Sequence, residues 1–272
     1  MADNRLGLIG CGKMGSALLA GLARQGGLFD SIYIYDIDAA KSRKLASETA
    51  ARSLNSGAEI AQETNVIVLA VKPNQIIPVL RNIAPLLHED KLLISIAAGV
   101  SLNSIAGEVE RHVPLARVMP NTPCLIGQGV SAVSFGKFVK EDQKTLIFKM
   151  LAAVGSVEEI PETLMDAVTA VSGSGPAYLF LVAEAMIDAA VEVGIPRDLA
   201  RILVNQTISG SIAMLNQSGE HPAILREQVT SPGGTTIAAI KALENRGIRS
   251  AFYDAVQAAY DRSRALSQNT SG

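Results

Sequence analysis

The sequence predicts an α/β fold in its first part, a doubly wound parallel sheet, followed by an all-helical second part. Two observations predict this division. Up to about residue 160, short apolar runs alternate with stretches of helical period, as in repeated strand–helix–strand units. After VEEIPETLMDAV the strand signal ends, and long helical patterns separated by Gly and Pro follow. We therefore divide the chain of 272 residues into domains 1–160 and 161–272.

Each predicted element has its own sequence pattern. The apolar runs RLGLIG, SIYIYD and VIVLAV read as strands, and each is followed by a helical pattern: MGSALLAGLARQ, DAAKSRKLASET and QIIPVLRNIAPLL. KLLISIAAG, LARVMPN and GVSAVSF are further strand candidates. In the second part, helices are predicted over 176–193, 197–217, 235–245 and 249–268. Their apolar residues occupy more than one face, which favours burial against a second subunit.

Composition excludes several classes of partner. Hydrophobic residues make up 48% of the chain and charged residues 18%, which is enough apolar content for a large core. The net charge of -2, without a run of lysine or arginine, does not favour nucleic acid and leaves a small molecule as the expected partner. Cys11 and Cys124 are too few for a disulfide framework, which suits a reducing compartment. We expect a cytoplasmic protein.

Neither a membrane span nor a metal site is expected. The N-terminus MADNRLGLIG lacks the pattern of a signal peptide, and the apolar stretch AYLFLVAEAMIDAAVEVG is interrupted by Glu184, Asp188 and Glu192. The histidines do not have the spacing of metal ligands, and we expect each to be a surface or capping residue: His88, His112 and His221.

A glycine loop predicts a dinucleotide site. In IGCGKMG, Gly10, Gly12 and Gly15 have the G-x-G-x-x-G spacing between a predicted strand and a predicted helix. Asp36 ends the next strand about 20 residues later, as the Rossmann fingerprint requires. Gly10 and Gly12 would allow close approach of the backbone to a pyrophosphate, and Gly15 would let the helix lie against the strand. We interpret Cys11 as a small side chain that fills space between the glycines, and not as a nucleophile.

Asp36 bears on the choice of cofactor. A carboxylate at this position hydrogen-bonds a ribose 2'-hydroxyl and repels a 2'-phosphate, so by itself it favours NAD over NADP. Lys41 and Arg43 follow it and could offset the repulsion. The alternative, that both are solvated charges on a helix, is equally open at this point.

Three further strand ends belong to the predicted cofactor crevice, because ligands of open α/β sheets bind at the carboxyl ends of the strands. LAVKPNQ ends a strand at Ala70–Pro73, ISIAAGV ends another at Ala97, Ala98 and Gly99, and VMPNTP contains Asn121 and Pro123. Small residues here would leave room for a nicotinamide. The alternative interpretation is that these small and turn-forming residues only end the strands and shape ordinary loops.

The helical part contains two Gly- and Ser-rich segments, VSGSGPAY and VTSPGGTTIAAI. Each is predicted to open a helix, where free N–H groups could bind a carboxylate, although capping by Ser174, Thr235 or Thr236 would explain them without a ligand. SGSGPAY contains no charged side chain, whereas alcohol dehydrogenation usually needs a base such as His or Lys. An iminium substrate needs no such base, and Thr236 could hydrogen-bond its nitrogen.

These motifs together resemble one family. IGCGKMGSAL, AVKP, SIAAGV, MPNTP, SGSGPAY, GEHPAILREQVTSPGGTTI and LENRGIRSA occur in order over nearly the whole chain, and the sequence is similar to pyrroline-5-carboxylate reductase. The resemblance implies a Rossmann domain followed by a helical dimerisation domain, with dimers often assembled into decamers. It implies an oxidoreductase of proline biosynthesis that reduces L-1-pyrroline-5-carboxylate to L-proline with NADPH or NADH.

The resemblance also implies site residues. Thr236 is the expected catalytic residue, near the imine nitrogen, and the substrate contacts fall on Ser231, Gly234, Thr235 and Thr236. Asp36 departs from the family, in which many members carry a small polar residue. With Asp36 from the fingerprint, the expected cofactor contacts are Gly10, Cys11, Gly12, Lys13, Met14, Gly15, Asp36, Asn55, Ala70, Val71, Lys72, Pro73, Ala97 and Ala98.

Two other functions compete with this one. A β-hydroxyacid dehydrogenase-like oxidoreductase shares the expected architecture, but that class places a catalytic lysine soon after a Gly-rich turn, and SGSGPAYLFLVAEAMIDAA has none. A nucleotide-sensing or scaffold protein could keep the fold without turnover. Both the cofactor loop and the carboxylate turn are intact in the sequence, which favours an enzyme.

Overall fold

A computed structural model describes residues 4–109 and 112–269. The chain divides by packing into two compact units. The first runs to Ser174 and takes in the residues from Ala259 onward, and the second is Gly175–Ala258. The predicted domain boundary, between residues 160 and 161, lies where the sequence periodicity changes. Division by packing uses a different criterion, so the predicted domain boundary stays a prediction.

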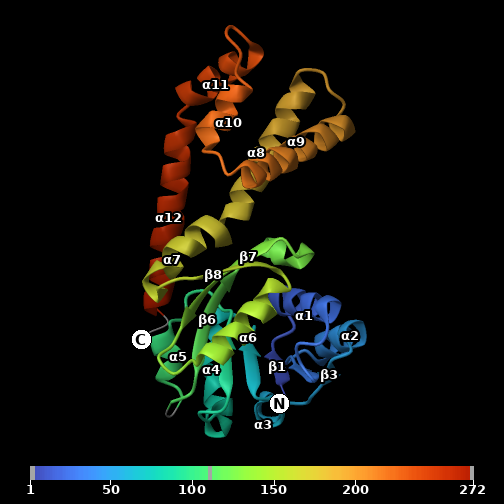
Figure 1. The fold of residues 1–272 in the computed structure, drawn as a ribbon, viewed down its shortest axis with the longest axis vertical. Coiled ribbons are helices and arrows are strands. Elements are labelled where there is room, and N and C mark those ends of the chain that lie inside the picture. The colour runs from blue at the N-terminus through green and yellow to red at the C-terminus, as the bar shows by residue number, and fades with distance from the viewer. Residues whose placement is uncertain (1–3, 110–111, 270–272) are drawn as a thin grey trace. The chain divides into compact units, whose positions relative to one another are not determined.

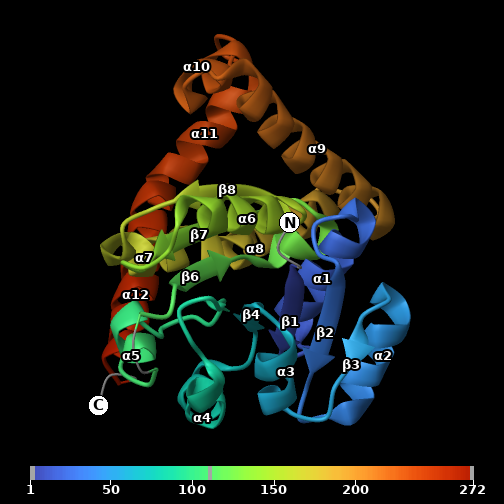
Figure 2. The same ribbon diagram turned by 60° about the horizontal axis from the view of Figure 1, so that its bottom comes forward.

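The first unit is built on one sheet. Among the described residues it has eight strands in the order β3-β2-β1-β4-β5-β6-β7-β8, and the first six of that order are mutually parallel (Figures 1 and 2). This is the strand order of a Rossmann fold, which confirms the predicted class. The strands are β1 (Arg5–Ile9), β2 (Ser31–Tyr35), β3 (Arg52–Ser53), β4 (Val66–Leu69), β5 (Leu92–Ser95), β6 (Leu115–Pro120), β7 (Gly129–Phe135) and β8 (Gly155–Glu159).

Helices cover both faces of this sheet, and each face has its own core. On β4, Val66 and Val68 belong to the core under α1, α2 and α6, whereas Ile67 and Leu69 belong to the core under α3, α4 and α5. Alternate residues of a strand point to opposite faces, so a strand buried on both sides reads as a continuous apolar run. The helices are α1 (Lys13–Gln25), α2 (Ala39–Thr49), α3 (Gly57–Glu63), α4 (Pro73–Ile83), α5 (Leu102–Ala106), α6 (Glu141–Ala152) and α7 (Met165–Val168).

The far end of the sheet departs from the parallel pattern. β7 runs antiparallel to β6, because only a short 3-10 segment, η2 (Thr122–Ile126), joins them, and a parallel crossover needs a longer connection. β8 pairs parallel to β7. It was not among the predicted strands, since its sequence GSVEE has almost no apolar residue. The other 3-10 segments are η1 (Ala84–Leu86) and η3 (Glu162–Leu164), and η4 (Thr169–Gly173) is a π turn.

The second unit is helical, as predicted. It contains α8 (Gly175–Glu192), α9 (Arg197–Ser218), α10 (Pro222–Gln228), α11 (Thr235–Asn245) and the first half of α12 (Ile248–Asn269). α8 and α9 pack against each other but bury few side chains in the single chain: α8 has no buried residue and α9 has Ala200 and Val204. Large apolar side chains are therefore left exposed, among them Phe180 at 69% and Ile202 at 61%.

One helical run has the length and composition of a membrane span. It extends over Glu162–Glu192, with a mean hydropathy of 1.3 in its most apolar stretch, of which 6% is buried. Glu184, Asp188 and Glu192 lie within it, and these charges are the reason that no membrane span is expected from the sequence. A helix that buries an apolar surface against a second subunit has the same composition, so a single run of this kind is weak evidence for a membrane.

Candidate active site

The predicted cofactor residues gather at one edge of the sheet, where the parallel strands end. Along this edge the strand order places Asn55 after β3, Asp36 after β2, the glycine loop after β1, Ala70 after β4 and Ala97 after β5. The connections reverse direction between β1 and β4, which is where an open α/β sheet forms its crevice. The fold thus aligns residues up to about 90 positions apart in the chain along one continuous edge.

The glycine loop has the geometry of an anion cradle. Gly10 has φ +106°, and a Cβ there would lie 2.7 Å from the backbone of Ala70. Gly12 precedes α1 and faces open space, with no side chain capping the helix start. The first helical bond in this turn runs from Ser16 N to Gly12 O, so the preceding N–H groups have no helical acceptor. These residues fit a pyrophosphate.

Asp36 holds the glycine loop in place. Cys11 N donates to Asp36 Oδ2 at 2.7 Å, and Asp38 N donates to Asp36 Oδ1 at 2.9 Å. The side chain is partly exposed, and each carboxylate oxygen keeps a further lone pair for a ribose hydroxyl. Lys41 and Arg43 are both exposed on α2, and Lys41 Nζ pairs with Asp38 at 3.6 Å. Asp36 therefore holds the glycine loop through its bond to Cys11 N, and its contact with a ribose stays a prediction.

The Cys11 side chain is buried and packs in the hydrophobic core, which agrees with the prediction that it fills space. It is 6% exposed, and burial, followed by the negative charge of Asp36, raises the pKa of its thiol to about 12. At neutral pH the thiol is protonated, so it is a poor nucleophile.

The other cofactor-side residues occupy the starts of helices or the ends of strands. Lys72 is the N-cap of α4, and Pro73 follows at its first position, where a missing N–H costs nothing. Ala97 is buried at 5% exposure, immediately after β5. Asn55 is exposed, and its backbone N–H donates to Glu59 at 3.0 Å, which orders the turn before α3.

The predicted substrate residues form a second cluster, in the helical unit. Gly233 has φ +67°, and Gly234 N donates to Ser231 O at 3.1 Å, which closes a tight turn before α11. Gly234 is the N-cap without a side-chain cap, so the first N–H groups of α11 are open. Among the described residues, the hydroxyls of Thr235 and Thr236 bond to no protein group, whereas Thr230 Oγ1 donates to Arg226 O at 2.6 Å. This cluster can bind a carboxylate and offer a free hydroxyl.

VSGSGPAY contains the first residue of α8, Gly175, as expected, but the turn before this helix is not an open loop. The chain is already helical from Met165, and Ser174 N donates to Thr169 O at 2.9 Å, the bond of a π turn. The Ser174 N–H is therefore not free for a carboxylate, and the structure gives no support to Ser174 as a helix cap. Instead, the turn is held by Asn121, whose Nδ2 donates to Ser172 O at 3.2 Å. The sequence marked Asn121 as a strand end but carried no signal for this contact.

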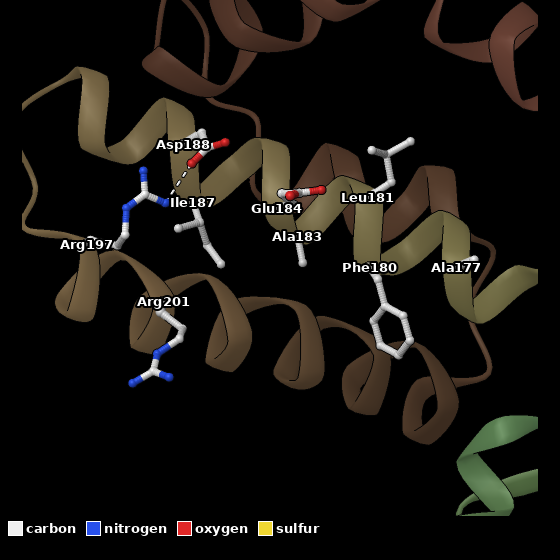
Figure 3. A pocket seen from close by; sticks show the side chains of 9 residues that line it. All are labelled: Ala177, Phe180, Leu181, Ala183, Glu184, Ile187, Asp188, Arg197 and Arg201. Carbon is white, nitrogen blue, oxygen red and sulfur yellow. Dashed lines mark hydrogen bonds and ion pairs between the residues drawn. The ribbon is translucent and has the colours of Figure 1, made fainter. Parts of the chain in front are cut away.

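The groove between α8 and α9 contains none of the predicted site residues. Figure 3 shows Phe180, Ala183 and Ile187 projecting from α8 toward α9, with Arg197 and Asp188 paired at 2.7 Å at one end. Its lining also includes Glu184 and Arg201, but neither the glycine loop nor the Ser231–Thr236 cluster contributes to it.

The histidines lie outside both clusters. His221 caps α10 by accepting from Ala223 N at 3.2 Å, which confirms the predicted capping role. His88 is exposed beside Asp90 at 3.6 Å, and His112 is exposed with its ring 4.5 Å from that of Phe138. Within residues 4–109 and 112–269, no three His, Cys, Asp or Glu side chains come together as a metal site.

Comparison with known proteins decides the family. Residues 162–266 match a family model described as pyrroline-5-carboxylate reductase dimerisation, and residues 5–99 match one described as NADP oxidoreductase, coenzyme F420-dependent. The pyrroline-5-carboxylate reductase of Pisum sativum is 42% identical over 96% of this chain and 96% of its own length. The chain belongs to the pyrroline-5-carboxylate reductase family.

Solved structures of pyrroline-5-carboxylate reductases have the same fold. One from Coxiella burnetii has a TM-score of 0.91 at 33% identity, covering 97% of this chain and 99% of its own. One from Plasmodium falciparum, described with NADP bound, has a TM-score of 0.87 at 35% identity, covering 98% and 99%. The family resemblance is therefore confirmed over both units, and the β-hydroxyacid dehydrogenase alternative is not favoured.

Proposed function

We propose that the chain reduces the C=N bond of L-1-pyrroline-5-carboxylate to give L-proline, with NADPH or NADH as the hydride donor. The observation that carries this is the open start of α11, where free N–H groups lie beside the unbonded hydroxyl of Thr236. A cyclic imine with a carboxylate needs one anion site and one hydrogen-bond partner for its nitrogen. The cluster Ser231–Thr236 supplies both.

The chemical groups of the substrate indicate which residues of this cluster bind its carboxylate and which bind its nitrogen. We assign the carboxylate to Ser231, Gly234 and the N–H groups of Thr235 and Thr236, at the positive end of the helix dipole. The protonated imine nitrogen donates to Thr236 Oγ1, which orients the C=N bond and stabilises its charge. Because the nitrogen already carries its proton, the step needs no general base from the protein.

The cofactor is assigned to the sheet edge of the first unit. A reduced nicotinamide supplies the hydride when it is bound. The glycine loop binds the pyrophosphate through backbone N–H groups, Asp36 and Asn55 bind the adenosine end, and Ala70–Pro73 with Ala97 and Ala98 leave room for the ring. Gly10 supports this assignment, since a Cβ there would meet the backbone of Ala70 and displace the loop.

We further propose a cytoplasmic homodimer that assembles into a homodecamer. The dimer is supported by the match to a dimerisation model and by the exposed apolar surface of α8 and α9. A cytoplasmic location agrees with two free, buried cysteines, Cys11 and Cys124.

The decisive experiment compares NADPH and NADH oxidation on addition of pyrroline-5-carboxylate, with chromatographic identification of proline. We expect turnover with at least one cofactor and stoichiometric proline. Cofactor binding without turnover on this or any related cyclic imine would contradict the proposal and favour the nucleotide-sensing alternative.

A further inference from the structure

Asn121 lies where three segments of the first unit meet. It follows β6 directly, at the same sheet edge as the cofactor residues. Val130 N, at the start of β7, donates to Asn121 Oδ1 at 2.9 Å, and Asn121 Nδ2 donates to Ser172 O in the π turn at 3.2 Å. One side chain therefore joins the end of β6, the start of β7 and η4, which is 51 residues away in sequence.

The pairing requires an amide. One partner is an N–H group and the other a carbonyl, so the side chain has to accept on one atom and donate on another at the same time. Asparagine does both, whereas an ionised aspartate of the same shape can only accept. The two partners also define the orientation of the amide, because the reverse orientation would face N–H with N–H and carbonyl with carbonyl.

The π turn that Asn121 holds occupies a special place in the chain. It ends at Gly173, and the second unit begins at Gly175. A π turn within a helical run inserts an extra residue and often marks a functional site. Gly173 lies against β6, where a Cβ would come 2.7 Å from Met119 Cε, so the turn packs on the strand that carries Asn121.

We infer that Asn121 is a positioning residue of the reductase: it fixes the π turn on the nicotinamide side of the cofactor edge, at the point where the chain leaves the first unit for α8. Two features support this. The turn is bonded to the sheet through the Asn121 amide, and the segment after it leads without interruption into the helical unit that carries the substrate cluster. The inference rests on the proposed function for its kinetic consequence.

The test uses a matched pair of substitutions in the full-length protein. Asn121→Asp keeps an acceptor for Val130 N–H but sets a carboxylate oxygen against Ser172 O. Asn65→Asp makes the same chemical change at the opposite edge of the sheet, where Asn65 Oδ1 accepts from Arg5 N at 2.8 Å. We would measure kcat, the KM of each substrate, Tm, and amide exchange of the peptide that spans residues 169–176.

For Asn121→Asp we expect kcat to fall about tenfold, with the KM of the cofactor within about twofold, because the cofactor residues stay in place. Exchange at Ser174 N, the π-turn amide, should be about tenfold faster. Asn65→Asp should change neither, even if it lowers Tm as much. If Asn121→Asp does not fold, Asn121→Ala, which adds no repulsion, is judged by the same measurements.

The inference is overturned if kcat and exchange stay at the wild-type values, or if Asn65→Asp lowers kcat equally at the same Tm. A wild-type protein without turnover would contradict the proposed function instead. Amide exchange would then still decide whether Asn121 holds the turn, since it does not depend on activity.

Discussion

The carboxylate of Asp36 has a structural contact in addition to its predicted role in cofactor binding. Its Oδ2 accepts from the glycine-loop residue Cys11, while its partly exposed face is the expected neighbour of the ribose. A residue that is usually interpreted as choosing between NAD and NADP therefore also stabilises the glycine loop by a hydrogen bond. Substituting it has to affect the binding of both cofactors.

We predict that Asp36→Ser raises the preference for NADPH over NADH about tenfold, because removing a partly screened charge relieves about 1.4 kcal/mol of repulsion toward a 2'-phosphate. It should also lower kcat/KM for NADH, since serine does not reach Cys11 N. The measurement is kcat/KM with each cofactor. Asp38→Ser is the control, because serine still caps α2 there. An unchanged ratio would assign the choice of cofactor to another residue.

Thr236 is the residue on which the proposed chemistry depends most. Thr236→Val should lower kcat/KM for pyrroline-5-carboxylate about 30-fold, the loss of about 2 kcal/mol from a hydrogen bond to a charged nitrogen. The dissociation constant of NADPH, measured by fluorescence, should stay unchanged. Thr207→Val removes a hydroxyl that only bonds to Leu203 O on α9 and serves as the control. Wild-type turnover in Thr236→Val would remove Thr236 from the mechanism.

At the scale of elements, the end of α12 is tied to α7 by a shared carboxylate. Ser263 Oγ donates to Asp166 Oδ1 at 2.7 Å, and Ser267 Oγ donates to the same oxygen at 3.1 Å. Ser263 is buried, and a Cβ on Gly99 would lie 3.7 Å from Leu266 Cβ. The last turns of α12 therefore back the loop after β5 that carries Ala97 and Ala98.

We predict that Asp166→Ala lowers the free energy of unfolding by about 2 kcal/mol, because it leaves the buried Ser263 hydroxyl without its acceptor. Amide exchange over residues 259–267 should become faster, reporting local release of the helix end. Asp90→Ala, at an exposed position, should change neither quantity. Equal exchange in both variants would show that packing alone holds α12.

At the scale of the whole molecule, the second unit is incomplete as a single chain. α8 is rich in apolar residues but buries none of them in the single chain. Leu179, Phe180 and Leu181 are 50%, 69% and 65% exposed. An apolar surface of this kind marks an interaction site. A second copy that covers it would also explain why a helix with the composition of a membrane span belongs to a metabolic enzyme.

We predict a dimer or larger assembly without detergent, and a shift toward monomer in Phe180→Glu, whose charge would cost about 2 kcal/mol or more at the interface. Sedimentation equilibrium measures both and shows whether dimers associate further into decamers. Ile37→Glu places the same charge at an apolar position that is 85% exposed on the first unit, and it should leave the mass unchanged. A monomeric wild type, or one that needs detergent, would contradict the dimer.

Much of the fold and of the cofactor cluster followed from local sequence patterns. The run VIVL between helical patterns predicted a strand buried on both faces, and the spacing of Gly10, Gly12 and Gly15 predicted the loop, because periodicity and backbone freedom are properties of neighbouring residues. The direction of β7 was not predicted, since it depends on the length of a connection that contains a short 3-10 segment. VSGSGPAY contains the start of α8 at Gly175, as predicted, but the expectation of free N–H groups there missed the π turn η4, in which Thr169 O accepts from Ser174 N.

The sequence by itself determined the fold class, the cofactor loop and the motifs that identify the family, because these are encoded within short stretches. The tertiary structure alone decided which groups those motifs contact. Asp36 bonds to Cys11 across 25 residues and Asn121 to Ser172 across 51, and neither partner is visible in the spacing of residues. Such contacts depend on where the sheet brings the ends of distant strands, so they arise only when the whole chain has folded.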